Sequence, residues 1–141
     1  MDWIISSDPS RVQLDVVHRW LAAEYWSPNI RREIVERAFA NSLVFGAYRG
    51  AHQLGVARVV TDQATFAWLC DVFVDESARG QGIATAMVRA ALDDPRLQTL
   101  RRWCLATRTA HAVYRPLGFE PVDARIWMQI VTDARRWSEV A

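Results

Sequence analysis

The sequence has few residues that would support a metal site or a disulfide framework. It contains two cysteines, Cys70 and Cys104, which have neither metal-ligand spacing nor the number that a disulfide framework needs. We therefore expect two buried free thiols and no bound metal. No apolar run is long enough to span a bilayer, and Asp2 stands where a signal peptide would carry positive charge. These absences predict a cytoplasmic protein with no membrane partner.

An excess of charge of one sign is also absent. Lys and Arg together number 17 and Asp and Glu 16, so the formal net charge is +1. This balance gives no reason to expect nucleic acid as a partner. A chain of 141 residues, of which 51% are hydrophobic, is long enough for one domain with a core and too short for two ordinary domains. We expect a single domain over residues 1–141 and a function that depends on a local site.

Two common phosphate-binding motifs are missing as well. A P-loop needs the tripeptide Gly-Lys-Ser or Gly-Lys-Thr, which occurs nowhere in the chain. A dinucleotide fingerprint would need a third glycine where Thr85 stands, and an acid about twenty residues later, where Arg101 and Arg102 stand. An enzyme built on either motif is therefore a distant alternative.

The stretch from Leu69 to Met87 has the pattern of a strand, a tight turn and a helix. Its β-branched and aromatic first half predicts a buried strand, and apolar residues at fourfold spacing predict the helix. The turn between them is Arg79-Gly80-Gln81-Gly82. A glycine-rich turn of this kind leaves several backbone N–H groups unpaired at the positive end of a helix dipole. Such a turn is a site for an anion, most simply phosphate.

Two motifs in this part of the chain occur in the order and separation of a known family. The first is Arg79-x-x-Gly82-x-Ala84, and the second places an alanine four residues before Tyr114, with Gly118-Phe119 after it. The first resembles the acyl-CoA pyrophosphate loop of the GNAT superfamily of N-acetyltransferases, whose pattern is Gln/Arg-x-x-Gly-x-Gly/Ala. The second is similar to another motif of that family. On both motifs together the chain is identified as a member, over about residues 42 to 131.

Hydrophobic periodicity and turn signals predict the remaining elements. They predict three antiparallel strands in a meander, followed by alternating strands and helices, which is an α/β domain with a mixed sheet. This α+β arrangement, a meander and then β-α-β-α-β, agrees with the acyl-CoA N-acyltransferase fold that the resemblance implies. The expected helices are Arg11–Ala23, Ile30–Ala40, Gly82–Leu92 and Ala110–Leu117, and the expected strands are Ser42–Tyr48, Gln53–Thr61, Phe66–Val74, Arg101–Thr107 and two within Phe119–Val131.

The resemblance implies acetyl-CoA as cosubstrate and a set of residues that bind it. Thr107 stands at the end of the fifth strand, where the family often has asparagine. In the family that position makes a side-chain contact to the pantetheine arm, and threonine departs from this pattern. The backbone of the fourth strand is expected to pair with that arm as if the sheet were extended. The residues implied are Val72, Phe73 and Val74 for the pantetheine, and Arg79, Gly80, Gln81, Gly82, Ile83 and Ala84 for the pyrophosphate.

Tyr114 and Asp71 are the expected catalytic residues. Tyr114 occupies the position whose hydroxyl, in many members of the family, protonates the departing sulfur; the alternative is a packed aromatic. Asp71 is an acid inside an apolar strand and is the first choice for a general base; the alternative is a structural acid paired with an arginine. His111 is the second choice for the base. A nucleophilic cysteine is disfavoured because neither thiol has a nearby charge that would lower its pKa.

Tyr25 and Trp26 lie on a loop between the first two helices, which in this fold commonly lines the acceptor site. The alternative is that they only pack the helix pair together.

We expect transfer of an acetyl group from acetyl-CoA to a primary amine, by direct attack in a ternary complex. A second reading is a CoA-binding sensor or assembly module without catalysis. The tryptophan-rich C-terminal strands would suit a homodimer interface.

Overall fold

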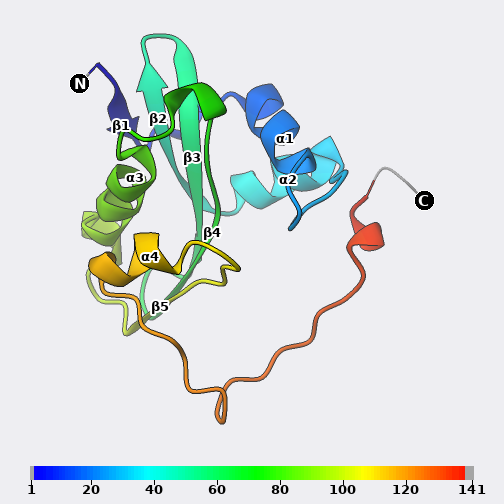
Figure 1. Ribbon diagram of the computed structural model, residues 1–141, viewed down its shortest axis with the longest axis vertical. Coiled ribbons are helices and arrows are strands. Elements are labelled where there is room, and N and C mark those ends of the chain that lie inside the picture. The colour runs from blue at the N-terminus through cyan, green and yellow to red at the C-terminus, as the bar shows by residue number, and fades with distance from the viewer. Residues whose placement is uncertain (1, 139–141) are drawn as a thin grey trace.

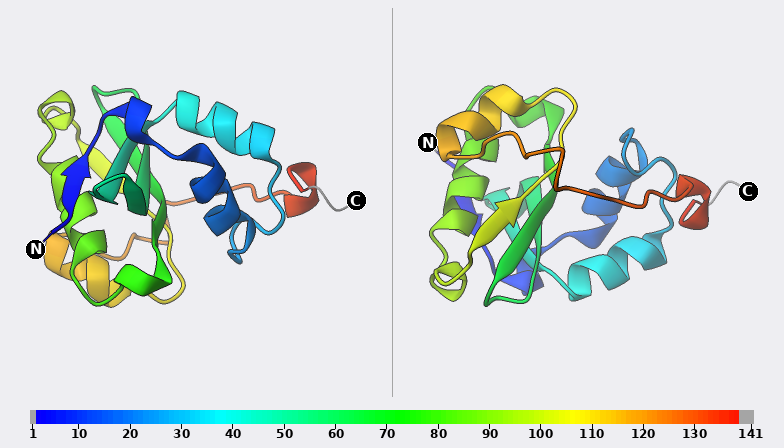
Figure 2. Two further views of the ribbon diagram at one scale, coloured as in Figure 1. Left: turned by 90° about the horizontal axis from the view of Figure 1, so that it is seen from above. Right: turned by 90° about the horizontal axis from the view of Figure 1, so that it is seen from below.

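The computed structural model describes residues 2–138. A mixed sheet of five strands in the order β1-β2-β3-β4-β5 lies between two helical layers (Figures 1 and 2). Helices α1 and α2 cover one face, and α3 and α4 cover the other. The helices are α1 Leu14–Ala22, α2 Arg32–Ala40, α3 Ile83–Leu92 and α4 His111–Tyr114, and the strands are β1 Ile4–Ser6, β2 Leu43–Arg49, β3 His52–Thr61, β4 Phe66–Val74 and β5 Arg102–Cys104.

The N-terminal layer is a pair of helices packed on the sheet. Asp8 and Pro9 begin a single 3₁₀ turn, and α1 begins only at Leu14, because the backbone at Val12 is extended. The predicted helix from Arg11 is therefore shorter than expected. Its buried stripe packs with α2 against the sheet; the residues that do so are Val17, Trp20 and Leu21 of α1 and Val35 and Phe39 of α2.

The predicted meander is confirmed, and it contains a bulge in β4. Arg58 pairs with Cys70 and Val56 pairs with Phe73, so two residues of β4 lie opposite one residue of β3. The first of these two, Asp71, has a φ of 52°, in the left-handed region that aspartate tolerates better than most residues. A bulge of this kind bends its strand and increases the local twist. The second half of β4 is therefore turned away from the line of the first half.

Strand β5 pairs with the first half of β4 alone. The parallel register runs from Phe66 opposite Arg102 to Trp68 opposite Cys104, and there β5 ends. The predicted strand Arg101–Thr107 is thus shorter than expected, because beyond Cys104 the bent β4 no longer offers a parallel partner. From Leu69 onward the outer edge of β4 has no strand beside it among the described residues. This separation of β4 from β5 creates the opening in which the candidate site lies.

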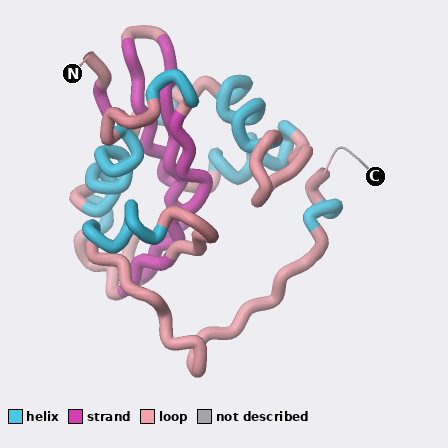
Figure 3. Tube along the Cα trace, in the orientation of Figure 1, coloured by secondary structure: helices cyan, strands magenta, loops and turns pink. Residues whose placement is uncertain are grey.

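The two strands predicted within Phe119–Val131 do not form, and this expectation was wrong. Residues 120–133, here called the C-terminal strap, run around one end of the sheet without joining it (Figures 1 and 3). The chain then makes a 3₁₀ turn at Ala134–Arg136, and the Arg31 N–H donates to the carbonyl of Trp137 at 2.8 Å. An isolated pair of strands is marginal without a face to bury, and within the described chain no face covers this one. The α/β fold class itself is confirmed.

Candidate active site

The main cavity of the molecule lies where β4 and β5 separate and has a volume of about 590 Å³. Its walls come from residues 24–26, the bulged part of β4, the segment after β5, Tyr114 of α4 and Trp137 near the end of the chain. This cavity brings together six of the residues singled out from the sequence. They are Tyr25, Trp26, Asp71, Val72, Thr107 and Tyr114.

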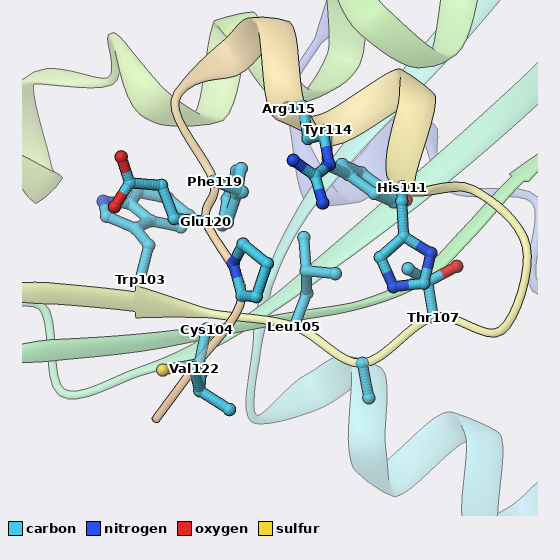
Figure 4. A pocket seen from close by; sticks show the side chains of 12 residues that line it. Trp103, Cys104, Leu105, Thr107, His111, Tyr114, Arg115, Phe119, Glu120 and Val122 are labelled. Carbon is cyan, nitrogen blue, oxygen red and sulfur yellow. The ribbon is translucent and has the colours of Figure 1, made fainter. Parts of the chain in front are cut away.

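A second cavity of about 400 Å³ lies between β5 and α4 (Figure 4). It shares Tyr114 and the segment 105–107 with the main cavity, so the two adjoin there. His111, the second choice for a base, lines this smaller cavity and is not in the main one. Thr107 lies beside it, and the Thr107 hydroxyl oxygen accepts a hydrogen bond from the Ala110 N–H at 3.0 Å. That hydroxyl therefore also supports the start of α4.

The glycine turn before α3 is open above its backbone. Gly80 and Gly82 have φ values of 79° and 81°, in the left-handed region that favours glycine. A Cβ atom built on either one would meet no heavy atom within 4 Å. Gly82 is also the N-cap of α3, and its position supplies no side-chain hydrogen bond to the first turn. The turn thus presents free N–H groups and empty space at the positive end of a helix dipole, as the sequence predicted.

Arg79 holds this turn to the end of β4. Its Nε donates to the carbonyl of Val74 at 2.9 Å, and its guanidinium lies 5.3 Å from the centre of the Phe73 ring. The Phe73 ring in turn packs on Trp20 of α1 at 5.2 Å, while Val74 packs on the opposite, α3 side of the sheet. The side chains of this part of β4 therefore serve the core, which leaves the main chain of its outer edge for another partner.

Tyr114 lines both cavities. The ring packs edge-on against Phe119 at 5.9 Å, and within residues 2–138 the hydroxyl makes no hydrogen bond. Burial raises the pKa of Tyr114 above its usual value, with a smaller contribution from the neighbouring Tyr25. The hydroxyl is therefore protonated throughout the neutral range, which is the state that a proton donor needs.

Asp71 is tied down on both carboxylate oxygens. The Nε of Arg58 donates to Oδ2 at 2.7 Å, and the indole N–H of Trp26 donates to Oδ1 at 3.0 Å. The two ion-paired side chains are only 18% and 12% exposed. This is the arrangement that a structural acid paired with an arginine requires, whereas the role of general base stays a prediction. The bond to Trp26 also fixes the aromatic loop over β4, so this loop both packs and lines the cavity.

Several residues of the main cavity were not among the sequence candidates, and those with charged or large aromatic side chains are Glu24, Arg58, Trp68 and Trp137. Glu24 directly precedes the aromatic pair on its loop, a signal that could have been used. Arg58 lies across from Cys70 in the sheet register, which follows once the hairpin is aligned. Trp137 comes from the end of the chain, and no local pattern in the sequence places it there.

Both cysteines are free, as expected, but only Cys104 is fully buried, and Cys70 is half-buried. The expectation that no charge would lower either thiol pKa was wrong, since Arg58 acts on Cys70 and Arg102 on Cys104, but burial outweighs both. Burial raises the pKa of Cys70, which lines the main cavity, to about 12. Burial likewise raises the pKa of Cys104. Since the thiolate is the reactive form, neither side chain is suited to act as a nucleophile. The disfavoured covalent route gains no support from the structure.

Residues 2–138 contain no group of three or more His, Cys, Asp or Glu side chains arranged to hold a metal ion. Over the same residues no helix combines the length and the apolar character needed to cross a membrane.

The opened mixed sheet, the glycine turn at the start of α3 and the tyrosine facing the opening define the fold of the GNAT acetyltransferases. The sequence profile of the Acetyltransferase (GNAT) family matches residues 12–119, and the chain belongs to this family. The structure of a Xanthomonas campestris pv. campestris protein assigned to the family as an acetyltransferase is 38% identical, with a TM-score of 0.89 and coverage of 92% of this chain and 93% of that one. The resemblance inferred from the two motifs is confirmed.

Two more distant relatives show how far the likeness extends. A Gibberella zeae protein assigned as an acetyltransferase is 26% identical over 101 residues, and this chain spans 57% of its length, with 57% of this chain matched. The structure of a Clostridium acetobutylicum protein assigned as an acetyltransferase, solved with acetyl-CoA, is 18% identical, with a TM-score of 0.70 and coverage of 92% of this chain and 94% of that one. At this identity the second comparison shows the fold alone.

The glycine turn generates a first prediction. Replacing Gly82 by valine should lower CoA affinity at least about tenfold in calorimetry, because the side chain fills space that the phosphates need. The matched control is Gly50→Val, since Gly50 also has a positive φ, of 57°, and open space around its Cβ, but lies in the β2–β3 hairpin. Both variants should lose about 1–2 kcal/mol of stability from backbone strain. If a folded Gly82→Val protein binds CoA with unchanged affinity, the glycine turn does not hold the CoA phosphates.

The ion pair of Asp71 generates a second prediction. Asp71→Asn keeps the size and tolerates the positive φ, yet leaves the Arg58 charge unbalanced. We expect Asp71→Asn to lose about 1–3 kcal/mol of unfolding free energy, and Arg58→Gln to lose a similar amount. The shape of the pH profile of kcat/KM should not change. Thermal unfolding and pH-rate measurements on both variants check this. Loss of the acidic limb in Asp71→Asn alone would instead establish Asp71 as the general base.

Proposed function

We propose that this chain transfers the acetyl group of acetyl-CoA to a primary amine, by direct attack of the amine in a ternary complex. The observation that carries the proposal is Tyr114, which lines the opening between β4 and β5 and whose hydroxyl keeps its proton at neutral pH and forms no hydrogen bond within the described chain. Membership of the acetyltransferase family supports acetyl transfer as the reaction class.

The residues present fit acetyl-CoA, which supplies an activated acetyl thioester. The N–H groups from Arg79 to Ala84 would hold the pyrophosphate, because the space above Gly80 and Gly82 is empty. The main chain of Val72 to Val74 would pair with the pantetheine amides along the free edge of β4. A protein of this fold was solved with acetyl-CoA, which supports acetyl-CoA as the cosubstrate.

The contribution of Tyr114 is proton transfer to the leaving group. As the amine nitrogen bonds to the acetyl carbon, the bond from that carbon to sulfur breaks and sulfur takes the electron pair. The Tyr114 O–H gives its proton to that sulfur, so that the thiol leaves as a neutral product, and solvent later restores the phenol. The amine nitrogen loses one proton in the same exchange; solvent accepts it and returns an equivalent proton to the Tyr114 phenolate, so the overall step releases no net charge. The attack of the amine is direct because neither cysteine is in the reactive form.

The second reading, a CoA-binding module without catalysis, is favoured by a specific observation at Thr107. The family often has asparagine here, whereas the Thr107 oxygen accepts the Ala110 N–H and so serves the backbone of α4. A free donor to the cosubstrate is then the hydroxyl proton alone. Binding of acetyl-CoA without thiol release over a broad panel of amines would favour this reading over the enzyme.

The experiment that tests the proposal combines that amine panel with Tyr114→Phe. The phenylalanine keeps the packing on Phe119, so kcat should fall roughly 10²- to 10⁴-fold while CoA affinity and thermal stability change little. Release of free thiol from acetyl-CoA provides the measurement. Tyr48→Phe is the matched control, because Tyr48 is a buried tyrosine of β2 whose hydroxyl also lacks a partner but lies outside both cavities. If Tyr114→Phe turns over within a few-fold of the parent protein, Tyr114 is only a packed aromatic and not a proton donor.

A further inference from the structure

Four aromatic side chains line the main cavity, and this part of its lining is here called the aromatic end: Tyr25, Trp26, Trp68 and Trp137. The indole N–H of Trp26 donates to Asp71 and holds that ring, and the Arg31 N–H donates to the carbonyl of Trp137 and holds the backbone there. The rings of Tyr25 and Trp26 stand at 89° to each other with their centres 5.2 Å apart. Fixed rings at such angles offer flat apolar surfaces to a flat apolar ligand.

This aromatic end also carries an unbalanced negative charge. The lining acids are Glu24 and Asp71, and Arg58 neutralises Asp71. Within residues 2–138 Glu24 forms no ion pair, and its side chain is half-buried. The other cation nearby, Arg108, is stacked on the Tyr25 ring at 4.3 Å and is not among the lining residues. A carboxylate beside aromatic rings favours a cation, because both the charge and the ring faces attract it.

Resting on the proposed function, we infer that the acceptor is a primary arylalkylamine without a carboxylate. It binds as an ammonium at Glu24 with its ring against the tryptophans, and the ammonium gives one proton to solvent before its nitrogen attacks the thioester. A cavity of about 590 Å³ is in the range of roughly 300–1,000 Å³ that small ligands occupy. An amino-sugar would need many polar partners, and this wall supplies few. A carboxylate on the acceptor would meet Glu24 and be repelled.

Five amines test the acceptor class: 2-phenylethylamine, tryptamine, butylamine, phenylalanine and an aminoglycoside. We expect kcat/KM for the first two to exceed that of the other three at least tenfold. Quenching of tryptophan fluorescence by 2-phenylethylamine, with CoA present, measures binding without turnover. Failure of acetyl-CoA to bind would overturn the proposed function itself. Binding of acetyl-CoA with a preference for phenylalanine, butylamine or the aminoglycoside would overturn the acceptor class alone.

A charge-neutral variant tests the role of Glu24. Glu24→Gln should raise KM for 2-phenylethylamine roughly 10- to 100-fold and leave kcat within a few-fold, because the ion pair acts in binding. The control is Glu36→Gln on α2, outside both cavities, which should behave as the parent. If KM of Glu24→Gln is unchanged, the ammonium of the acceptor does not bind at Glu24.

Discussion

The β4 bulge at Asp71 is the constraint on which the site depends. A non-glycine residue with a φ of 52° costs free energy, and here three contacts hold it: the pairing of β3 and β4 on either side, the ion pair to Arg58 and the hydrogen bond from Trp26. Because of the bend, β5 can follow β4 only as far as Trp68. The free edge of β4, the main cavity and the opening for a cosubstrate all follow from that separation.

This constraint also couples the two helical layers to one cavity. Trp26 reaches β4 from the α1–α2 loop, and Tyr114 reaches the same opening from α4 on the opposite face of the sheet. Arg79 continues the connection, since it joins the glycine turn to the Val74 carbonyl and to the Phe73 ring that packs on α1. The glycine turn and the Trp26 ring are thus positioned by the second half of a single strand, and Tyr114 lines the opening beside it.

What could be predicted from the sequence was local. The glycine turn depends on the φ preference of Gly80 and Gly82, the helix after it on fourfold spacing, and the meander on alternating apolar residues, all of which neighbouring residues encode. The sequence predicted that the partner of Asp71 could be an arginine, but not which one. Identifying Arg58 requires the register of β3 and β4, and the shift in that register beside Asp71 is not visible in the sequence. Trp137 could not be placed, since its contact with residue 31 crosses most of the chain. The sequence predicted strands within the strap because apolar spacing indicates a strand, but spacing alone does not show whether a partner strand lies beside it in the same chain.

Burial has opposite chemical consequences for two groups in the same cavity. It raises the pKa of both Cys70 and Tyr114 by disfavouring their anions. For a thiol this removes the nucleophile that a covalent acetyl intermediate would need, while for a phenol it preserves the proton that a leaving thiolate requires. An unbalanced carboxylate at Glu24, by contrast, favours a cation at the aromatic end of the same space. A cavity that keeps its thiol and its phenol protonated and attracts a cationic amine is suited to direct transfer between two bound substrates, in which the protein donates a proton and forms no covalent bond to the acetyl group.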